Sequence, residues 1–283
     1  MPEMRRPDGA TIHYETYGSG YPLLLFAPGG VNSEIEFWDN SAIQPIREFA
    51  SEFLVIAMDQ RNAGRSFAPL VAPRYEEMVA DQLAVLNELG ITRAHVMGGC
   101  IGVAYCLRIL AEAPARIMAA VCQDPVGLDG TNSHAVFFAM FEPTIALARE
   151  QGMAAVVRSA LENPLFVRNN AAGPFARRIA GDAAFRDRVQ SMGVNEYVAV
   201  IEAYKRSQWP ERPLFSVEED QVQGFAAPLL VLPGSDPFHP TGVARRICEL
   251  APVATMLDVD CRSEAKLGAT IETVCAFLRQ HAS

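Results

Sequence analysis

A cysteine between two glycines is the residue of this sequence whose surroundings best suit covalent chemistry. Cys100 stands in segment 94–103, AHVMGGCIGV, which predicts a strand, a Gly-x-Cys-x-Gly turn and a helix. A sharp turn from strand to helix strains the backbone of its central residue, and Gly98 and Gly102 leave room for that turn. The helix dipole and the free N–H groups at such a position favour a thiolate. The alternative interpretation is a small apolar cysteine buried beside a tight turn.

An acidic residue and a histidine follow a later apolar run. Asp236 comes after the run LLVL at 229–232, and His239 follows three residues later. A base must approach the thiol to about 3 Å, directly or through one water, and a loop position allows this for His239. We therefore expect a Cys100–His239 pair with Asp236 nearby. The alternatives are a surface histidine and an aspartate that faces its own backbone.

The elements that must position these residues alternate between strands and helices. Apolar runs at 23–26, 53–58, 94–97, 117–121 and 229–232 predict buried strands, and 11–17 and 253–259 predict two more. Helices are expected at 75–89, 101–112 and 242–250 and along the face 271–278. This alternation predicts an α/β fold with a doubly wound, mostly parallel sheet. The strand signal disappears over 125–227, so we predict a core of residues 1–124 and 228–283 and a helical cap insertion of residues 125–227.

Together, three segments resemble the α/β-hydrolase superfamily. Residues 28–30 (PGG) follow the first buried strand, residues 59–66 (DQRNAGRS) follow the second, and the turn at Cys100 follows the third. The resemblance runs from Gly9 to about Leu278, with Asn62 where the family usually has glycine. It implies an α/β-hydrolase fold with a cysteine at the nucleophile elbow. It also implies structural roles for three residues of the second segment: Asp59, Arg61 and Gly64.

The resemblance also assigns the remaining parts of the site. It implies an oxyanion hole made by the backbone N–H of Ile101 and that of Gly30 or, alternatively, Val31. Asp236 matches the position of the family's acid, and Asp124, after the run 117–121, is a second candidate because some members carry the acid there.

The histidine departs from the family pattern. The resemblance implies a histidine after the strand expected to end near Val259, but residues 260–265 read DCRSEA. His239, or His134 at the start of the insertion, must then replace it. His134, Trp38 and Phe138 are the candidate substrate-binding residues, although Phe138 also suits packing of the insertion. An excess of arginine over residues 158–188 suits either a clamp for a carboxylate substrate or a solvated helix face.

These features imply a hydrolase with a cysteine nucleophile. Its substrate would be a small carboxylic ester, lactone or thioester, and the reaction would pass through an acyl-enzyme without a cofactor or metal. Because the usual C-terminal histidine is missing, two alternatives stay open: a non-hydrolytic member, either a lyase or an acyltransferase, and a catalytically weak ligand-binding or sensor protein.

Composition sets the remaining limits. Half of the 283 residues are hydrophobic, a fifth are charged, and the net charge of −9 argues against binding to nucleic acid. No apolar run reaches the ~18 residues of a membrane span, and the N-terminus does not resemble a secretory signal. The six scattered cysteines favour free thiols in a reducing cytoplasm. We therefore expect a cytoplasmic protein whose partner is a small-molecule substrate, with a homodimer left open.

Overall fold

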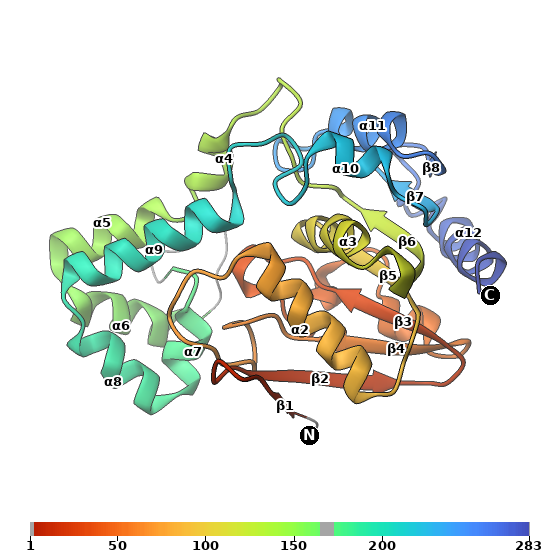
Figure 1. Cartoon of the computed structure of the whole chain (residues 1–283). Helices are drawn as coiled ribbons and strands as arrows, with labels where there is room; N and C mark the ends of the chain where they lie inside the picture. Colours follow the sequence, from red (N-terminus) through yellow and green to blue (C-terminus); the bar gives the residue numbers. More distant parts are fainter. Residues whose placement is uncertain (1–2, 165–172, 283) are drawn as a thin grey trace.

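A computed structural model describes residues 3–164 and 173–282 (Figure 1). Within this part of the chain, eight strands form a sheet in the order β1-β2-β4-β3-β5-β6-β7-β8. The outer strands β1 and β2 run antiparallel to their neighbours, and all other neighbouring pairs are parallel, which confirms the predicted mostly parallel sheet. The strands are β1 (Glu3–Arg5), β2 (Thr11–Tyr17), β3 (Tyr21–Phe26), β4 (Phe53–Met58), β5 (Ala94–Gly99), β6 (Ile117–Gln123), β7 (Leu229–Leu232) and β8 (Ala254–Met256).

Helices cover both faces of the sheet because alternate residues of its central strands point to opposite sides. Leu24 of β3 and Val96 of β5 belong to one apolar core, which includes residues of α2, α3 and α11. Leu23 and Met97 belong to the other, which includes residues of α1 and α12. The predicted doubly wound arrangement is therefore confirmed. The helices that cover the sheet are α1 (Pro45–Phe49), α2 (Tyr75–Glu88), α3 (Ile101–Glu112), α11 (Thr241–Leu250) and α12 (Leu267–Gln280).

Between β6 and β7, the described residues form helices and no strand. Helices α5, α6, α8 and α9 group together at one side of the sheet, at the left of Figure 1. Helix α10 instead packs against α3 and α11. The exact division of the chain into core and cap stays a prediction. The helices of this stretch are α4 (His134–Phe138), α5 (Glu142–Gln151), α6 (Met153–Glu162), α7 (Ala176–Gly181), α8 (Ala183–Ser191), α9 (Val194–Gln208) and α10 (Glu219–Gln223).

Short 3-10 helices lie in connections between these elements: η1 (Gly30–Asn32) and η2 (Ile35–Asn40) follow β3, and η3 (Pro114–Arg116) precedes β6. All six cysteines are free thiols. None of the described helices combines the length and the apolar character that a membrane span requires.

Candidate active site

Cys100 occupies a strained turn between β5 and α3. Its backbone angles are φ 54° and ψ −118°, in a region that residues with a side chain rarely adopt. The turn is tight enough that a Cβ on Gly98 would overlap the carbonyl of Gly102, and a Cβ on Gly102 would overlap the carbonyl of Phe26 in β3. The two glycines flanking Cys100 are therefore required by packing, and the cysteine stands at the start of a helix, as the sequence predicts.

His239 is held by Asp236, from the same loop between β7 and α11. Its Nδ1 lies 2.9 Å from Oδ2 of the aspartate. The other carboxylate oxygen accepts the backbone N–H groups of Phe238 and His239, at 2.8 and 3.1 Å. Asp236 thus combines the two roles considered for it, because one oxygen shapes the loop and the other orients the imidazole ring.

Electrostatics connect His239 to Cys100. Burial lowers the pKa of His239, but its interactions with Cys100 and Asp236 outweigh burial and raise that pKa to about 10. The hydrogen bond from His239 lowers the pKa of Asp236 to about 2. Nε2 of His239 is buried and has no well-formed hydrogen bond to a described residue, so this nitrogen is left to interact with the thiol. The structure therefore brings Cys100, His239 and Asp236 together.

The second candidate acid, Asp124, follows β6 and has a different partner. Both of its carboxylate oxygens accept hydrogen bonds from the guanidinium of Arg262. Arg262 belongs to the loop between β8 and α12, where the family resemblance implies a histidine. The loop expected to contain a histidine thus supplies an arginine, and Asp124 is engaged with it rather than with His239.

The two predicted oxyanion donors emerge at the same edge of the sheet. Strands β3 and β5 are parallel neighbours with Phe26 opposite Gly98, so the turn at Gly30 and the elbow both follow the ends of paired strands. Ile101 begins α3, and Gly30 begins η1 with φ 63°. Neither N–H donates to a backbone oxygen in the described part of the chain. Both groups are therefore available to a developing oxyanion.

The segment 59–66 supports the turn that contains Gly30. The carboxylate of Asp59 accepts the backbone N–H groups of Ile35 and Arg65, both at 2.8 Å. The N–H of Gln60 donates to the carbonyl of Ser33 at 2.9 Å. These bonds attach residues 33–35 to the end of β4 and give Asp59 the structural role that the resemblance implies.

The three predicted substrate-binding residues lie in different surroundings. Trp38 is buried, and a Cβ placed on Gly99 would lie 3.2 Å from its ring. His134 bonds through Nε2 to the carbonyl of Pro210 at 3.0 Å, and its ring centroid lies 5.6 Å from that of Phe138. The described contacts of His134 are therefore with other residues of the insertion, which makes His239 the better placed of the two candidate bases.

The sequence did not predict an aromatic cluster that joins the predicted insertion to the loop between β7 and α11, which contains His239. Phe137 lies in its centre, with ring centroids of Trp209, Phe215 and Phe238 at 4.6, 4.9 and 5.4 Å. Trp209 also approaches the turn at Gly30, since a Cβ on Gly30 would lie 3.9 Å from its ring. Aromatic composition was the only signal, and it did not show which rings meet.

Two arginines of the predicted insertion pair with residues of the predicted core instead of lying on a solvated helix face. Nη1 of Arg177 lies 2.6 Å from Oε1 of Glu34 and 2.8 Å from Oε2 of Glu36. Arg178 donates to the side chain of Asn62. Arg168, from the same arginine-rich stretch, lies outside the described residues. The described arginines of α7 therefore attach the insertion to the turns beside the site.

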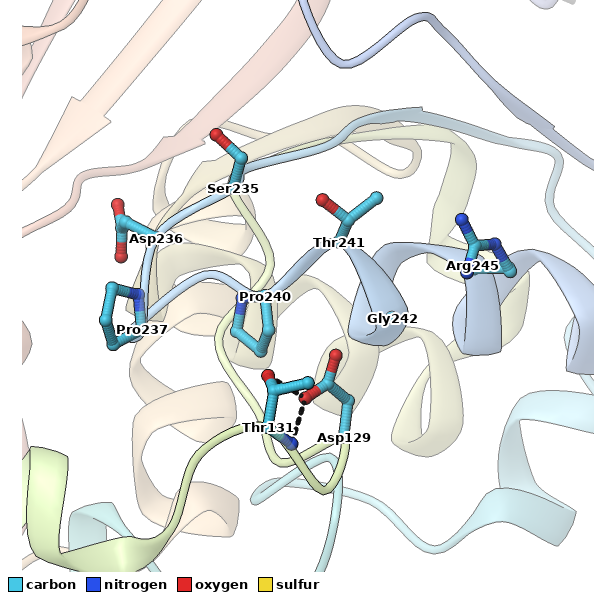
Figure 2. Close-up of a pocket in the computed structure, with 9 residues that line it drawn as sticks. All are labelled: Asp129, Thr131, Ser235, Asp236, Pro237, Pro240, Thr241, Gly242 and Arg245. Atoms are coloured by element: carbon cyan, nitrogen blue, oxygen red, sulfur yellow. Dashed lines mark hydrogen bonds between the residues drawn. The ribbon is translucent and has the colours of Figure 1, made fainter.

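Solvent reaches the acid from outside. Asp236 lines a surface pocket of about 460 Å³, which Figure 2 shows between the loop that carries Asp129 and the start of α11. Its side chain is 56% exposed, so its pairing with His239 is partly screened. Among residues 3–164 and 173–282, no group of three or more His, Cys, Asp or Glu is placed to hold a metal ion.

Known proteins resemble this chain in sequence and in fold. The putative carbamate hydrolase RutD of Azorhizobium caulinodans is 32% identical over 108 residues, which are 38% of each chain. The dihydrolipoyllysine-residue acetyltransferase component of the acetoin cleaving system of Cupriavidus necator is 27% identical over 127 residues, 44% of this chain and 33% of that protein. The chain therefore spans less than half the length of these curated relatives.

Similarity of structure extends over the whole chain. The enol-lactonase of Burkholderia xenovorans LB400 superposes with a TM-score of 0.61 at 20% identity, and the match covers 98% of this chain and 100% of the lactonase. The sequence model described as "alpha/beta hydrolase fold" matches residues 22–263. Because that match covers most of the chain, including the turns at Gly30 and Cys100 and the loops of Asp236 and Arg262, this chain belongs to the α/β-hydrolase fold family.

Proposed function

We propose that the protein hydrolyses a small carboxylic ester, lactone or thioester with Cys100 as nucleophile and His239 as acid and base. The observation that carries this proposal is the arrangement at the elbow. A cysteine with strained backbone angles meets a histidine whose Nδ1 is held by Asp236 and whose Nε2 is otherwise unpartnered. The proposed partner is a small-molecule substrate, and no cofactor enters the reaction.

Acylation begins when the ring of His239 takes the proton of the Cys100 thiol. Interactions with Cys100 and Asp236 raise the pKa of His239 to about 10, so the imidazolium that forms is stabilised beside the charged sulfur. The thiolate attacks the carbonyl carbon, and the N–H groups of Gly30 and Ile101 stabilise the oxyanion. When the bond to the leaving group breaks, Nε2 of His239 gives its proton to the leaving oxygen or sulfur.

Deacylation needs the opposite protonation state of His239. In the acyl-enzyme the sulfur carries no charge, so its contribution to the raised pKa of His239 is lost and the neutral ring becomes a usable base. The ring takes a proton from water, and the resulting hydroxide attacks the acyl carbon. The C–S bond breaks, the carboxylic acid leaves, and the proton on His239 returns to the sulfur, which restores the resting pair.

The cysteine nucleophile also indicates the class of leaving group. In the tetrahedral intermediate the sulfur of Cys100 competes with the substrate's own leaving group, and a thiolate departs more easily than an alkoxide, so leaving groups that need little protonation are favoured. Enolates, phenolates and thiolates are such groups, whereas simple alkoxides are not. We therefore expect enol lactones, aryl esters and thioesters to react faster than alkyl esters.

An acyltransferase is the second candidate. It is favoured by the similarity to the acetyltransferase component of Cupriavidus necator, although that match covers 44% of this chain. The same acyl-enzyme would then pass its acyl group to an acceptor other than water. Product analysis with and without added thiol or amine acceptors separates the two reactions.

The test compares the reactivity of two cysteines in the same molecule. Cys100 and Cys248 are both partly exposed, and burial raises the pKa of Cys248 to about 12. Iodoacetamide labelling is measured at each site by peptide mass spectrometry from pH 5 to pH 9. We expect Cys100 to react below pH 7 and Cys248 to stay unlabelled, and we expect His239→Ala to remove the low-pH reactivity.

A second measurement follows the acyl group itself. Mixing with p-nitrophenyl acetate and quenching in acid should leave an acetyl group on Cys100 and release a burst of nitrophenol. The Cys100→Ser variant should show neither, because a hydroxyl is far less acidic than a thiol and the sulfur's contribution to the raised pKa of His239 is lost. An ordinary thiol profile at Cys100 together with no acetyl adduct would overturn the proposal and favour a ligand-binding protein.

A further inference from the structure

Arg262 connects the ends of strands β6 and β7 at the start of the loop that contains His239. Its side chain is 16% exposed, and it donates to both carboxylate oxygens of Asp124, at the end of β6. One of the same nitrogens, Nη2, donates to the carbonyl of Pro233 at 2.9 Å, at the end of β7. A planar guanidinium is suited to such a bridge because its donors point in fixed directions.

Asp124 is itself held in an unusual conformation. Its φ is 52°, one of four positive values among the described non-glycine residues, and its backbone N–H donates to the carbonyl of Leu232 at 2.9 Å. A strained residue persists only where its surroundings determine it. Here the backbone bond to β7 and the pair with Arg262 together direct the carboxylate toward the loop that follows β7.

Gly234 joins this pair to His239. A Cβ placed on Gly234 would lie 2.5 Å from Cβ of His239, 2.7 Å from its carbonyl oxygen and 3.0 Å from Oδ1 of Asp124. The histidine and the Asp124 carboxylate therefore pack on the same glycine. On the other side, the hydroxyl of Thr241 donates to the carbonyl of Gly234 at 2.7 Å.

The pair of Asp236 with His239 does not place the ring relative to the elbow by itself. The two residues are three positions apart on one loop, and the aspartate side chain is 56% exposed. Rotation or displacement of that loop would carry both residues together and change the distance from Nε2 to Cys100. The loop needs an attachment to the sheet, and Arg262 supplies one at Pro233.

We propose that Arg262 is a positioning residue: its bridge between Asp124 and Pro233 holds the loop so that Nε2 of His239 faces Cys100. This inference rests on the proposed function of the Cys100–His239 pair. The bridge also keeps the Asp124 carboxylate occupied, so that it does not compete with Asp236 for the ring. The arginine thus lies in the loop where the family resemblance implies the histidine, and it supports a histidine that comes from the loop between β7 and α11.

The test removes the bridge and measures the pair. Arg262→Met is compared with Arg108→Met, a matched control: Arg108 is 13% exposed, pairs with Glu76 and Glu112, and donates to a main-chain carbonyl, that of Ser216. Iodoacetamide labelling of Cys100 is measured from pH 5 to pH 9, and the titration of the His239 ring is followed by NMR with labelled histidine.

We expect Arg262→Met to reduce labelling of Cys100 at pH 6 by about tenfold or more, toward the rate of His239→Ala, and to move the His239 titration to lower pH. Arg108→Met should lower thermal stability to a similar extent and leave both profiles unchanged. Arg262→Lys keeps the charge but lacks the planar fork, so it should give an intermediate profile. If Arg262→Met does not fold, Arg262→Lys is the variant that is compared with wild type and Arg108→Met.

The outcomes separate the two proposals. If wild type and His239→Ala label alike, the proposed function fails, and the NMR titration of Arg262→Met still decides the positioning role. If His239→Ala loses reactivity while both Arg262 variants keep the wild-type labelling and titration, the inference about Arg262 is overturned and the proposed function stands.

Discussion

Replacing Glu34 with glutamine is expected to remove a pH-dependent loss of stability. Glu34 lies between η1 and η2, with its side chain 2% exposed and Oε1 2.6 Å from Nη1 of Arg177. Burial raises the pKa of Glu34 to about 7, Arg177 opposes this, and the neighbouring carboxylates of Asp59 and Glu36 add to it. The ionised form is therefore the costly one in the folded protein.

The sign and size follow from that pKa. Between pH 4.5, the ordinary pKa of glutamic acid, and about 7, the folded protein binds a proton at Glu34 that the unfolded chain has lost. The stabilisation is complete below pH 4.5 and is lost as the pH rises through 7. At ~1.36 kcal/mol per pKa unit, the wild type should lose about 3 kcal/mol between pH 4 and pH 8 relative to a residue that does not titrate.

Urea unfolding of wild type, Glu34→Gln and Glu36→Gln at each pH unit from 4 to 8 measures this difference. The free energy of unfolding of Glu34→Gln should rise relative to wild type by about 3 kcal/mol across the range. Glu36 pairs with the same arginine, but its side chain is 60% exposed, so Glu36→Gln should change stability by only about 0–1 kcal/mol. A constant offset between wild type and Glu34→Gln would refute the reasoning.

Three further outcomes are expected. Gly102→Ala should prevent folding or sharply lower the melting temperature measured by calorimetry, because the added Cβ would overlap a main-chain oxygen of β3. The control Gly268→Ala places its Cβ in open space and should be neutral or stabilising, so equal effects of the two substitutions would contradict the tight elbow. Cys100→Ser should reduce turnover of an aryl ester by more than about 100-fold in a steady-state assay, and near-normal turnover would argue for a stronger base than His239. In chemical unfolding, Asn62→Ala should lower the free energy of unfolding more than Asn62→Gly does. Both variants lose the 2.7 Å hydrogen bond to the Tyr204 hydroxyl, but only alanine is strained at φ 60°, so the reverse order would contradict this account.

Much of the sheet could be predicted because its signals are local. The strands 53–58 and 229–232 and the helix 101–112 have the bounds that their apolar runs and flanking residues predict. The edges could not be predicted in the same way. The three residues of β1 alternate between exposed and buried, but so short a segment carries too little pattern to indicate a strand. The strand expected at 253–259 contains only residues 254–256. Val253 and Val259 are apolar but exposed at this edge, so burial does not extend the strand to them.

In the candidate site, too, the local features could be predicted from the sequence and the long-range contacts could not. The elbow at Cys100 could be identified from ten consecutive residues, because its geometry depends on two glycines beside it. The loop that contains Asp236 and His239 is also local, and its position after a strand suggested the pairing. The aromatic contact between Trp209 and Phe137 was not evident, since it joins residues far apart in the chain.

What the sequence by itself determined is the order of strands and helices, the strained cysteine between glycines, and the absence of a histidine at 260–265. Only the tertiary structure decided what replaces that histidine. Asp124 and Arg262 are 138 positions apart, and neither shows in its own surroundings that it binds the other. Their pairing depends on which strand ends become neighbours in the sheet. That arrangement is set by the packing of the whole chain and cannot be read from any short segment.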